Sequence, residues 1–539
     1  MNYNIAQPLQ EISRDYPHKL ALIHGSRSFT FAELDRLSRA YAFALAVQGV
    51  KRGDRVMLMV RPSIEFISLT FALFKLGAPV ILIDPGMGYK NLLGCVGSVK
   101  PQVFIGIPMA HIFKTFFPRH FDTVQLNICV GSSFGLFGKS LQSITDPAEH
   151  SFPAVHSEKT DLAAIIFTTG STGPPKGVRY EHGVFLAQLG LIRDYYGITL
   201  DDIDQPAFPL FALFSAALGA CSVIPDMNPA RPAQVNPEKF IRTIIKHNVT
   251  YSFGSPAIWN VVSGYCIKNS IRLPSLKKIL MAGAPVSGEL IGRVKRIVSA
   301  DAEIHTPYGA TESLPIVSMT GSEILSGTWP QTMKGKGTCV GRPLPGNDIR
   351  ILPISDDAIV AWDDDTVLSA DSIGEIVVKG EVVTREYDNN PRENALAKIR
   401  DGDTFWHRLG DTGYMDNEGR LWFCGRKAHR VITRTETMFT ICCEAIFNNH
   451  PQVYRSALVG VGEWGNQTPV LIVEPHEKIA NRAAFFTELL GLANQYDITR
   501  PIRNFLIHPS FPVDIRHNAK IFREKLAVWA ADKIVMSDE

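Results

Sequence analysis

The sequence predicts an α/β fold: a large N-terminal domain of α/β units that includes a β-rich unit, followed by a small α+β domain. Strand and helix patterns alternate near the N-terminus, which is typical of a largely parallel sheet. Beyond about residue 341 short strands alternate with turns instead, and a basic stretch at 427–434 opens a final region. With 539 residues in total and ~150 in a typical domain, the chain has room for about three or four compact units.

The composition is that of an ordinary globular protein, which excludes several classes. Hydrophobic residues make up 45% and charged residues 20% of the chain, so a largely disordered protein is excluded. The 55 Lys and Arg residues nearly balance 53 Asp and Glu residues, which gives a net charge of +2. Because the chain has no overall basic field, we expect no nucleic acid partner, although a local patch could still bind phosphate.

Neither the cysteines nor the apolar segments indicate a secreted or membrane-spanning protein. The eight cysteines include no CxxC pair, which argues against a disulfide scaffold and a structural zinc site. The N-terminus lacks a basic start followed by an apolar core, so we expect no signal peptide. The most apolar window, 66–83, contains Lys75 and a Gly-Ala-Pro break, whereas a membrane span requires ~20 unbroken apolar residues. We therefore expect that the chain has no transmembrane segment and that the protein is cytoplasmic.

Local patterns define the first elements in chain order. Thr30 and Glu33 form a capping-box pattern, which predicts a helix that stops near Gly49. Residues 56–60 predict a short apolar strand. The apolar window then predicts a helix near 65–76, a turn, and a buried strand at 80–83.

The later part of the chain predicts two further units. Between about residues 318 and 341 the chain is rich in Gly, Thr and Lys, which predicts a mobile connection. A β-rich unit is expected over about 341–426, within an N-terminal domain of residues 1–426, and residues 427–539 form the C-terminal domain. The strands predicted for the β-rich unit are 349–352, 374–378, 412–415 and 421–424, the last two joined by a turn at 416–419.

The strongest functional signal is a run of small polar residues after the predicted buried strand Leu162–Phe167. It reads Thr168, Thr169, Gly170, Ser171, Thr172, Gly173, Pro174, Pro175, Lys176, Gly177. Glycines let backbone amides approach an anion, hydroxyls add donors, and the lysine adds a positive charge. The spacing is not that of a Walker P-loop, because Pro175 stands where the second glycine is required. A generic run of this kind is a flexible polar loop, but the preceding strand and the Pro-Lys-Gly exit favour a phosphate cradle.

Three more segments carry side chains suited to a nucleotide, although each alone is compatible with a turn or a solvated surface. Tyr308-Gly309-Ala-Thr311-Glu312 combines an aromatic face for a base, a glycine for a tight turn, and two groups suited to a phosphate with its Mg²⁺. Asp411, beside glycines and ahead of Arg426, can accept hydrogen bonds from the two hydroxyls of a ribose. The third segment holds Lys520, close to the C-terminus.

In this order and at this wide spacing, the four segments resemble the adenylate-forming enzyme superfamily of acyl-CoA synthetases, luciferases and non-ribosomal peptide adenylation domains. The resemblance covers nearly the whole chain. It implies the adenylate-forming enzyme fold, in which a large AMP-binding domain holds ATP and an acid while a mobile C-terminal lid domain rotates to complete the site. It also implies ATP and Mg²⁺ as cofactors, and attack of a carboxylate on the α-phosphate to give an acyl–AMP anhydride and pyrophosphate.

The resemblance assigns the matching residues to ATP binding, Mg²⁺ binding and catalysis. Mg²⁺ would be held by Glu312 and Thr172. Lys520 would bridge the carboxylate and the α-phosphate, and Thr311 and Glu312 would complete the catalytic set. The residues implied in ATP binding, from the phosphates to adenine and ribose, are Thr168, Thr169, Gly170, Ser171, Thr172, Gly173, Lys176, Gly283, Ala284, Pro285, Tyr308, Gly309, Asp411 and Arg426.

Segments near 71–78, 208–214, 222–234, 421–427 and 511–520 resemble a narrower branch, the olefin β-lactone synthetases of bacterial long-chain hydrocarbon biosynthesis. This resemblance implies a 2-alkyl-3-hydroxy fatty acid as substrate, whose own 3-hydroxyl displaces AMP and closes a β-lactone. The apolar stretches 208–218 and 253–258 would then be walls for two alkyl chains. The branch also implies assembly with a β-lactone decarboxylase and a ketoacid reductase.

Two alternatives stay open beside the lactone-forming ligase. One is a medium- or long-chain fatty acyl-CoA ligase, or a fatty acyl-AMP ligase that loads a carrier protein. Thioester-forming relatives carry a glycine-bearing loop after the hinge, but no glycine lies between Lys427 and Glu444, and Ala428 stands at the hinge position, which disfavours CoA transfer. The other is a nucleotide-binding scaffold without catalysis, against which the charges at Glu312, Asp411 and Lys520 argue.

Overall fold

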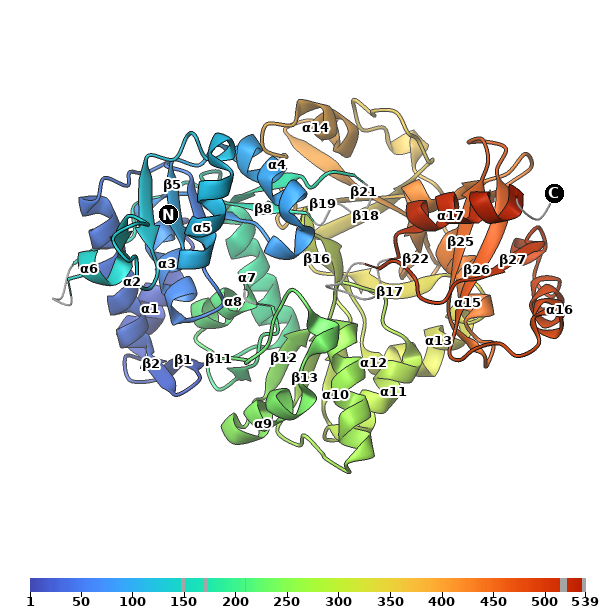
Figure 1. The fold of residues 1–539 in the computed structure, drawn as a ribbon, viewed down its shortest axis with the longest axis horizontal. Coiled ribbons are helices and arrows are strands. Elements are labelled where there is room, and N and C mark those ends of the chain that lie inside the picture. The colour runs from blue at the N-terminus through green and yellow to red at the C-terminus, as the bar shows by residue number, and fades with distance from the viewer. Residues whose placement is uncertain (147–150, 169–172, 209, 514–520, 536–539) are drawn as a thin grey trace.

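The computed structural model describes residues 1–146, 151–168, 173–208, 210–513 and 521–535. Over these residues the strands form two seven-stranded sheets, an eight-stranded sheet, a three-stranded sheet and a two-stranded hairpin. Figure 1 follows the chain from the blue N-terminal sheet and its helices, through green and yellow elements, to the red C-terminal region at the opposite end. The α/β class predicted from the sequence is confirmed.

Two seven-stranded sheets make up the N-terminal part, and each is parallel apart from one antiparallel edge strand, β2 or β9. The central strands of the second sheet, β3, β5 and β8, are continuous apolar runs, as expected for parallel strands that helices cover on both faces. The first sheet has the order β14 (Glu303–His305), β13 (Lys278–Met281), β12 (Tyr251–Gly254), β10 (Ile203–Asp204), β11 (Cys221–Ile224), β1 (Leu20–His24), β2 (Arg27–Thr30). The second has the order β7 (Lys139–Ser140), β6 (Leu126–Cys129), β5 (Val103–Gly106), β3 (Val56–Met59), β4 (Val80–Leu82), β8 (Leu162–Phe167), β9 (Gly177–Glu181).

The eight-stranded sheet is antiparallel and contains all four strands predicted for the β-rich unit, as parts of β18, β19, β21 and β22. It also takes in β15 and β16, which precede residue 341. The division into domains at residue 426 stays a prediction. The strand order is β15 (Tyr308–Ala310), β16 (Ser313–Ser318), β17 (Thr338–Pro343), β22 (Leu421–Arg426), β21 (Thr404–Met415), β19 (Gly374–Gly380), β18 (Asn347–Leu352), with β20 (Lys398–Asp401) paired to β21.

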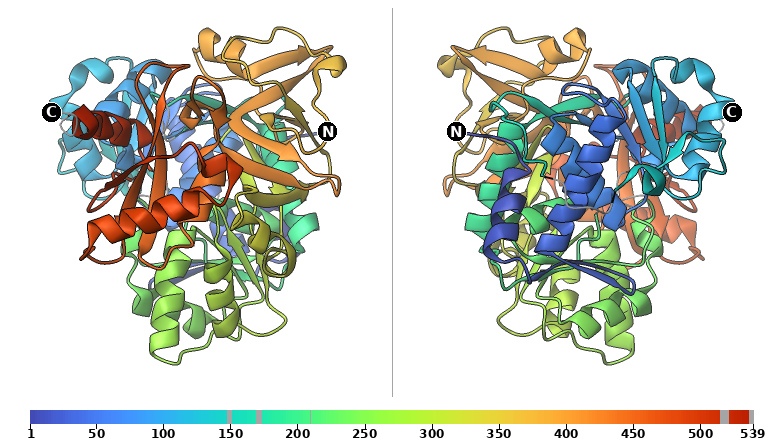
Figure 2. Two further views of the ribbon diagram at one scale, coloured as in Figure 1. Left: turned by 90° about the vertical axis from the view of Figure 1, so that its right-hand side faces the viewer. Right: turned by 90° about the vertical axis from the view of Figure 1, so that its left-hand side faces the viewer.

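The C-terminal region is a three-stranded sheet with helices on both faces, which Figure 2 shows from the side. Leu458 and Leu471 point to one face and pack under α15 and α16, whereas Ala457 and Val470 point to the other and pack against α17. Its strands are β25 (Val453–Val461), β26 (Thr468–Pro475) and β27 (Asn504–Ile507), and the hairpin β23 (Val431–Ile432) and β24 (Thr437–Met438) precedes them.

The helices lie mainly in the connections between strands, as alternating α/β patterns predict. In chain order they are α1 (Gln7–Asp15), α2 (Phe31–Val47), α3 (Ile64–Leu76), α4 (Tyr89–Val99), α5 (Pro108–Phe116), α6 (Leu141–Ile144), α7 (His182–Tyr196), α8 (Phe211–Leu218), α9 (Pro237–His247), α10 (Pro256–Lys268), α11 (Gly288–Ile297), α12 (Gly321–Glu323), α13 (Trp329–Thr332), α14 (Pro391–Ala397), α15 (Thr440–Phe447), α16 (Arg482–Ala493) and α17 (Arg523–Val535).

The early elements form where the local patterns predict them. Thr30 caps α2 by accepting a hydrogen bond from the Glu33 amide, and Glu33 accepts one from the Thr30 amide in return. The apolar window folds as helix α3, a left-handed turn at Gly77 and strand β4. Lys75 lies fully buried in α3 and pairs with Asp35 at 2.5 Å, which explains how an apolar helix of the core can contain a lysine.

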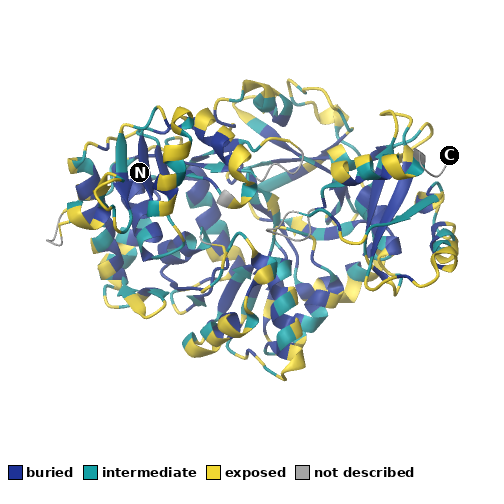
Figure 3. Ribbon diagram, in the orientation of Figure 1, coloured by how far each residue is buried: buried dark blue, intermediate teal, exposed yellow. Residues whose placement is uncertain are grey.

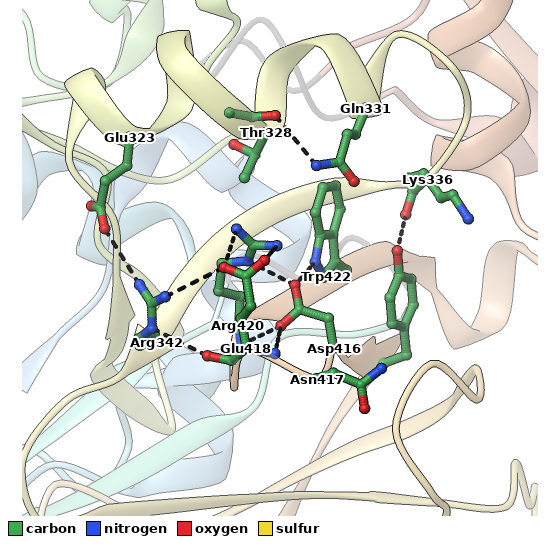
Figure 4. A network of polar contacts seen from close by, with 12 residues as sticks. Glu323, Thr328, Gln331, Lys336, Arg342, Asp416, Asn417, Glu418, Arg420 and Trp422 are labelled. Carbon is green, nitrogen blue, oxygen red and sulfur yellow. Dashed lines mark hydrogen bonds and ion pairs between the residues drawn. The ribbon is translucent and has the colours of Figure 1, made fainter.

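The segment predicted as a mobile connection, 318–341, instead forms short helical elements that are tied to the antiparallel sheet. A capping box between Thr320 and Glu323 starts α12, and a π-helical turn (Ile324–Thr328) leads into α13. Glu323 pairs with Arg342 at 3.4 Å, and Lys336 accepts a hydrogen bond through its carbonyl from Tyr414 at 3.0 Å (Figure 4). Arg342 follows the segment directly, but Tyr414 lies 78 residues further along the chain than Lys336, so the local composition did not reveal this contact.

The buried residues that form the core lie along the strands of the sheets, which are largely dark blue in Figure 3. Exposed residues concentrate on the outer faces of helices and in the loops. Among the described residues, none of the helices combines the length and the apolar character that a bilayer span requires.

Candidate active site

A cavity of about 1690 Å³ lies where the carboxyl ends of the parallel strands face the antiparallel sheet. Residues at or just after the ends of β3, β4, β8, β12 and β13 line it, which is the position at which open α/β sheets bind their ligands. All twelve described candidate residues line this cavity: Thr168, Gly173, Lys176, Gly283, Ala284, Pro285, Tyr308, Gly309, Thr311, Glu312, Asp411 and Arg426. Thr169, Gly170, Ser171, Thr172 and Lys520 lie outside the described residues.

At one end of the cavity three candidate side chains form a hydrogen-bonded group. The Tyr308 hydroxyl donates to one carboxylate oxygen of Asp411 at 2.6 Å, and Arg426 donates to the other at 2.7 Å. Asp411 and Arg426 are paired directly across β21 and β22, so the sheet register brings them together. The Asp411 charge raises the pKa of Arg426, and burial raises the pKa of Tyr308. Each carboxylate oxygen keeps a lone pair for a ligand hydroxyl.

At the other end, the base of the polar loop is closed by its own backbone. The Thr168 amide donates to the Lys176 carbonyl at 3.0 Å, and the Lys176 amide donates to the Thr168 hydroxyl at 3.0 Å. The Lys176 ammonium pairs with Glu393 of α14 and lies 5.0 Å from the centre of the Tyr387 ring. Two residues that no sequence motif marked, Glu393 and Tyr387, therefore hold the lysine charge at the edge of the cavity.

Glu312 is held by contacts to both its side chain and its backbone. The Tyr387 hydroxyl donates to the Glu312 carboxylate at 2.6 Å. The Glu312 carbonyl accepts from the amide and the hydroxyl of Thr384, at 2.9 and 3.0 Å. Lys398 donates to the Thr384 carbonyl. Burial lowers the pKa of this lysine to about 7, although the negative charge of Glu312 acts to raise it. Tyr387 holds the carboxylate directly, whereas Lys398 acts on the Glu312 backbone through Thr384, and no motif marked either residue.

A backbone contact requires the glycine at position 309, and the backbone of Thr311 anchors the same turn. A Cβ atom at Gly309 would lie 2.4 Å from the Ser313 carbonyl oxygen, so the tight turn that places Tyr308 beside Glu312 excludes a larger residue. The Thr311 carbonyl accepts a hydrogen bond from the Tyr180 hydroxyl at 2.5 Å. The sequence motif is thus a compact turn anchored to the edge strand β9.

The remaining wall of the cavity is apolar. Both stretches predicted as alkyl-chain walls contribute to it, with Phe211 and Phe214 from α8 and Phe253 from β12. The Phe211 and Phe253 rings are stacked, with their centres 3.6 Å apart. Polar groups and an apolar wall in one cavity suit an amphiphilic ligand.

Residues of the C-terminal region also reach the cavity. His429, Thr440, Ile521 and Arg523 line it, and Ile521 follows Lys520 directly in the chain. Arg523 forms two hydrogen bonds, of 3.0 and 2.6 Å, with buried Glu444 of α15. Burial lowers the pKa of His429 to about 3, and the neighbouring Arg523 and Arg426 act in the same direction. Its imidazole is therefore neutral at physiological pH.

Comparison with known proteins places the chain in a family. The AMP-binding enzyme family matches residues 9–388. The olefin β-lactone synthetase of Xanthomonas campestris pv. campestris is 43% identical over 99% of this chain and 98% of its own length, and that of Stenotrophomonas maltophilia is 42% identical over 98% of each. The solved structure of the amide bond synthetase McbA from Marinactinospora thermotolerans superposes with a TM-score of 0.81 at 19% identity, covering 98% of this chain and 99% of its own. The chain belongs to the AMP-binding enzyme family.

Proposed function

We propose that this protein is an ATP-dependent β-lactone synthetase of olefin biosynthesis. It activates a 2-alkyl-3-hydroxy fatty acid as an acyl–AMP, and the 3-hydroxyl of the same molecule then attacks the acyl carbon. The observation that carries the proposal is the 43% identity to the Xanthomonas olefin β-lactone synthetase over 99% of the chain. The cavity supports it, because polar groups suited to a nucleotide and an apolar wall occupy one continuous space.

In the first step a carboxylate oxygen of the acid attacks the α-phosphorus of ATP, and pyrophosphate leaves. The reactants are both anionic, so positive groups that complement the developing charge lower the barrier. Lys176 lies at the loop proposed to hold the phosphates, and the Asp411–Arg426 pair offers acceptors for the ribose hydroxyls. Lys520 is proposed to bridge the carboxylate and the α-phosphate.

Mg²⁺ is proposed to bind with the ATP phosphates at Glu312 and Thr172. The described residues contain no group of three or more His, Cys, Asp or Glu side chains that could hold a metal by themselves. Mg²⁺ fits this arrangement, because it commonly uses one or two protein ligands together with phosphate oxygens and water. Glu312 faces the cavity and Tyr387 orients its carboxylate, so the residues present fit the ion. When bound, the ion neutralises phosphate charge.

In the second step the 3-hydroxyl oxygen forms a bond to the acyl carbon, the bond from that carbon to the AMP oxygen breaks, and the hydroxyl proton is released. The ring closes only when the hydroxyl is held about 3–3.5 Å from the acyl carbon, and water must be excluded so that the anhydride does not hydrolyse. The stacked Phe211 and Phe253 rings and their apolar neighbours supply a dry wall for this purpose.

The 3-hydroxyl provides the sharpest test of the proposal. Purified protein is incubated with ATP, Mg²⁺ and either a 2-alkyl-3-hydroxy acid or the matched acid that lacks the hydroxyl, each with and without CoA. We expect pyrophosphate release with both acids, and lactone from the hydroxy acid alone, without CoA. A thioester that forms only with CoA would instead support an acyl-CoA ligase, and no pyrophosphate with any acid would support a scaffold.

The same branch assignment predicts assembly with a β-lactone decarboxylase and a ketoacid reductase. Such an assembly would pass the reactive lactone onward before it hydrolyses. Co-purification of the three proteins after joint expression tests this prediction.

A further inference from the structure

Large apolar side chains are exposed together on one edge of the second seven-stranded sheet. Phe116 at the end of α5 is 73% exposed, and Phe134 and Leu136 in the following loop are 75% and 80% exposed. With Tyr89 of α4 and Met109 and Ile112 of α5, which are also exposed, they form what we call the apolar rim. Folded proteins rarely expose so many large apolar side chains in one place unless the surface binds something.

Ring contacts link the three segments that carry the rim. Tyr89 stacks on Phe117, just after α5, with ring centres 6.3 Å apart, and His111 of α5 stacks on Phe137 of the loop at 5.8 Å. Figure 1 shows α4 and α5 as neighbours beside β5. Met109, Ile112 and Phe116 recur at helical spacing, so α5 presents one apolar stripe outward while Ala110 packs into the core.

The stretch of chain that carries the rim is basic. Residues 86–140 contain five Lys and Arg residues but a single acidic residue, Asp122, whereas the whole chain has 55 basic and 53 acidic residues. Within the described parts of the chain none of the five takes part in an ion pair, and Lys139 donates to the Gln48 amide oxygen at 2.7 Å. The five are Lys90, Lys100, Lys114, Arg119 and Lys139.

The rim is also continuous with the cavity of the active site. Tyr89 and Met109 line that cavity as well as the outer surface, and Leu92, Ala110 and Phe113 line it behind them. An apolar path therefore leads from the exposed surface to the polar loop at Thr168. This continuity matters for the proposed substrate, because an acid with two alkyl chains dissolves in lipid and not in water.

We propose that the apolar rim docks on an anionic lipid surface, from which the substrate enters the cavity without crossing water. The proposal rests on the proposed function for its substrate. A short helix with apolar side chains outward and cations beside them is the form that interfacial membrane binding takes. One basic residue near an anionic membrane strengthens binding only about fivefold, so the apolar side chains and several cations must act together.

Sedimentation of the full-length protein with lipid vesicles tests the proposal. We expect binding to vesicles that contain phosphatidylglycerol, little binding to pure phosphatidylcholine vesicles, and release by high salt. Phe116→Ser with Phe134→Ser, and separately Lys90→Glu with Arg119→Glu, should each lower the bound fraction at least tenfold. None of these four side chains lines the cavity.

A matched control keeps the result interpretable. Ile245 of α9 is 53% exposed and Lys246 follows it, so Ile245→Ser with Lys246→Glu makes the same kinds of change on another helix. This control should bind vesicles like the unmodified protein. The proposal is overturned if the unmodified protein does not bind anionic vesicles, or if the rim variants bind them as well as the control does. The proposal is also overturned if the rim variants bind vesicles normally but no longer bind a protein partner.

Two substrates separate this proposal from the proposed function. With a short, water-soluble 2-alkyl-3-hydroxy acid and no lipid, the rim variants should form lactone at the unmodified rate. With a long-chain acid supplied in anionic vesicles, their rate should fall in parallel with their binding. Lactone formation without vesicle binding contradicts only the docking surface. Vesicle binding without lactone from either acid contradicts the proposed function.

Discussion

The contact between Tyr387 and Glu312 gives a quantitative prediction. Tyr387→Phe removes one hydrogen bond, of 2.6 Å, to the carboxylate proposed to bind Mg²⁺, and leaves the aromatic ring under Lys176 in place. A hydrogen bond to a charged group contributes about 1.5–3 kcal/mol. Loss of a residue that orients a metal ligand typically lowers metal affinity or activity ~10–100-fold. We therefore expect kcat/KM for adenylation to fall by roughly that factor, and the Mg²⁺ concentration for half-maximal rate to rise.

The assay is pyrophosphate exchange measured over a series of Mg²⁺ concentrations. Tyr414→Phe is the matched control, because its hydroxyl donates to the Lys336 carbonyl at 3.0 Å and the residue does not line the cavity. Both variants lose a hydrogen bond of a buried tyrosine, so both should melt at a lower temperature. Only Tyr387→Phe should change the Mg²⁺ dependence. Equal Mg²⁺ curves for the two variants would refute the positioning of Glu312 by Tyr387.

Three further predictions concern other parts of the molecule. Lys520→Ala should abolish pyrophosphate exchange while ATP binding, measured by calorimetry, survives; normal exchange would remove Lys520 from the mechanism. Arg523→Ala should destabilise the C-terminal region by about 3–5 kcal/mol, because it leaves the buried Glu444 carboxylate unpaired; hydrogen exchange confined to this region checks it, and unchanged protection of α15 would contradict it. Burial lowers the pKa of Lys398 to about 7 in the folded protein, below the ordinary lysine value of 10.5, so the unfolded chain binds more protons between these values and stability should rise with pH across that window. Lys398→Met should flatten this rise in urea titrations at several pH values, and an equally steep rise would argue against the shift.

Local patterns predicted the elements that local interactions determine. The strand Leu162–Phe167 and the capping box at Thr30 form as predicted, because an apolar run and a reciprocal cap need only neighbouring residues. The contact of Tyr308 with Asp411 could not be predicted from spacing, since 103 residues separate them and only the tertiary fold brings β15 close to β21. The resemblance to a family supplied that information.

What the sequence did not reveal depends on distant partners. Tyr387, Glu393 and Lys398 stand in no recognisable motif, and they matter only because α14 and β20 pack beside the polar loop. In the same way residues 318–341 look irregular by composition, yet Tyr414, 78 residues beyond Lys336, ties the segment to the antiparallel sheet. Long-range packing, and not local propensity, decides both cases.

The transfer of labelled oxygen tests the central claim most directly. A 2-alkyl-3-hydroxy acid carrying oxygen-18 in its carboxylate is converted with ATP and Mg²⁺, and AMP and lactone are analysed by mass spectrometry. If the acid is activated as an acyl–AMP and its own hydroxyl closes the ring, one labelled oxygen appears in AMP and the lactone keeps one label, in its carbonyl. Unlabelled AMP together with a lactone that keeps both labels would show that the hydroxyl was activated instead, and would contradict the account.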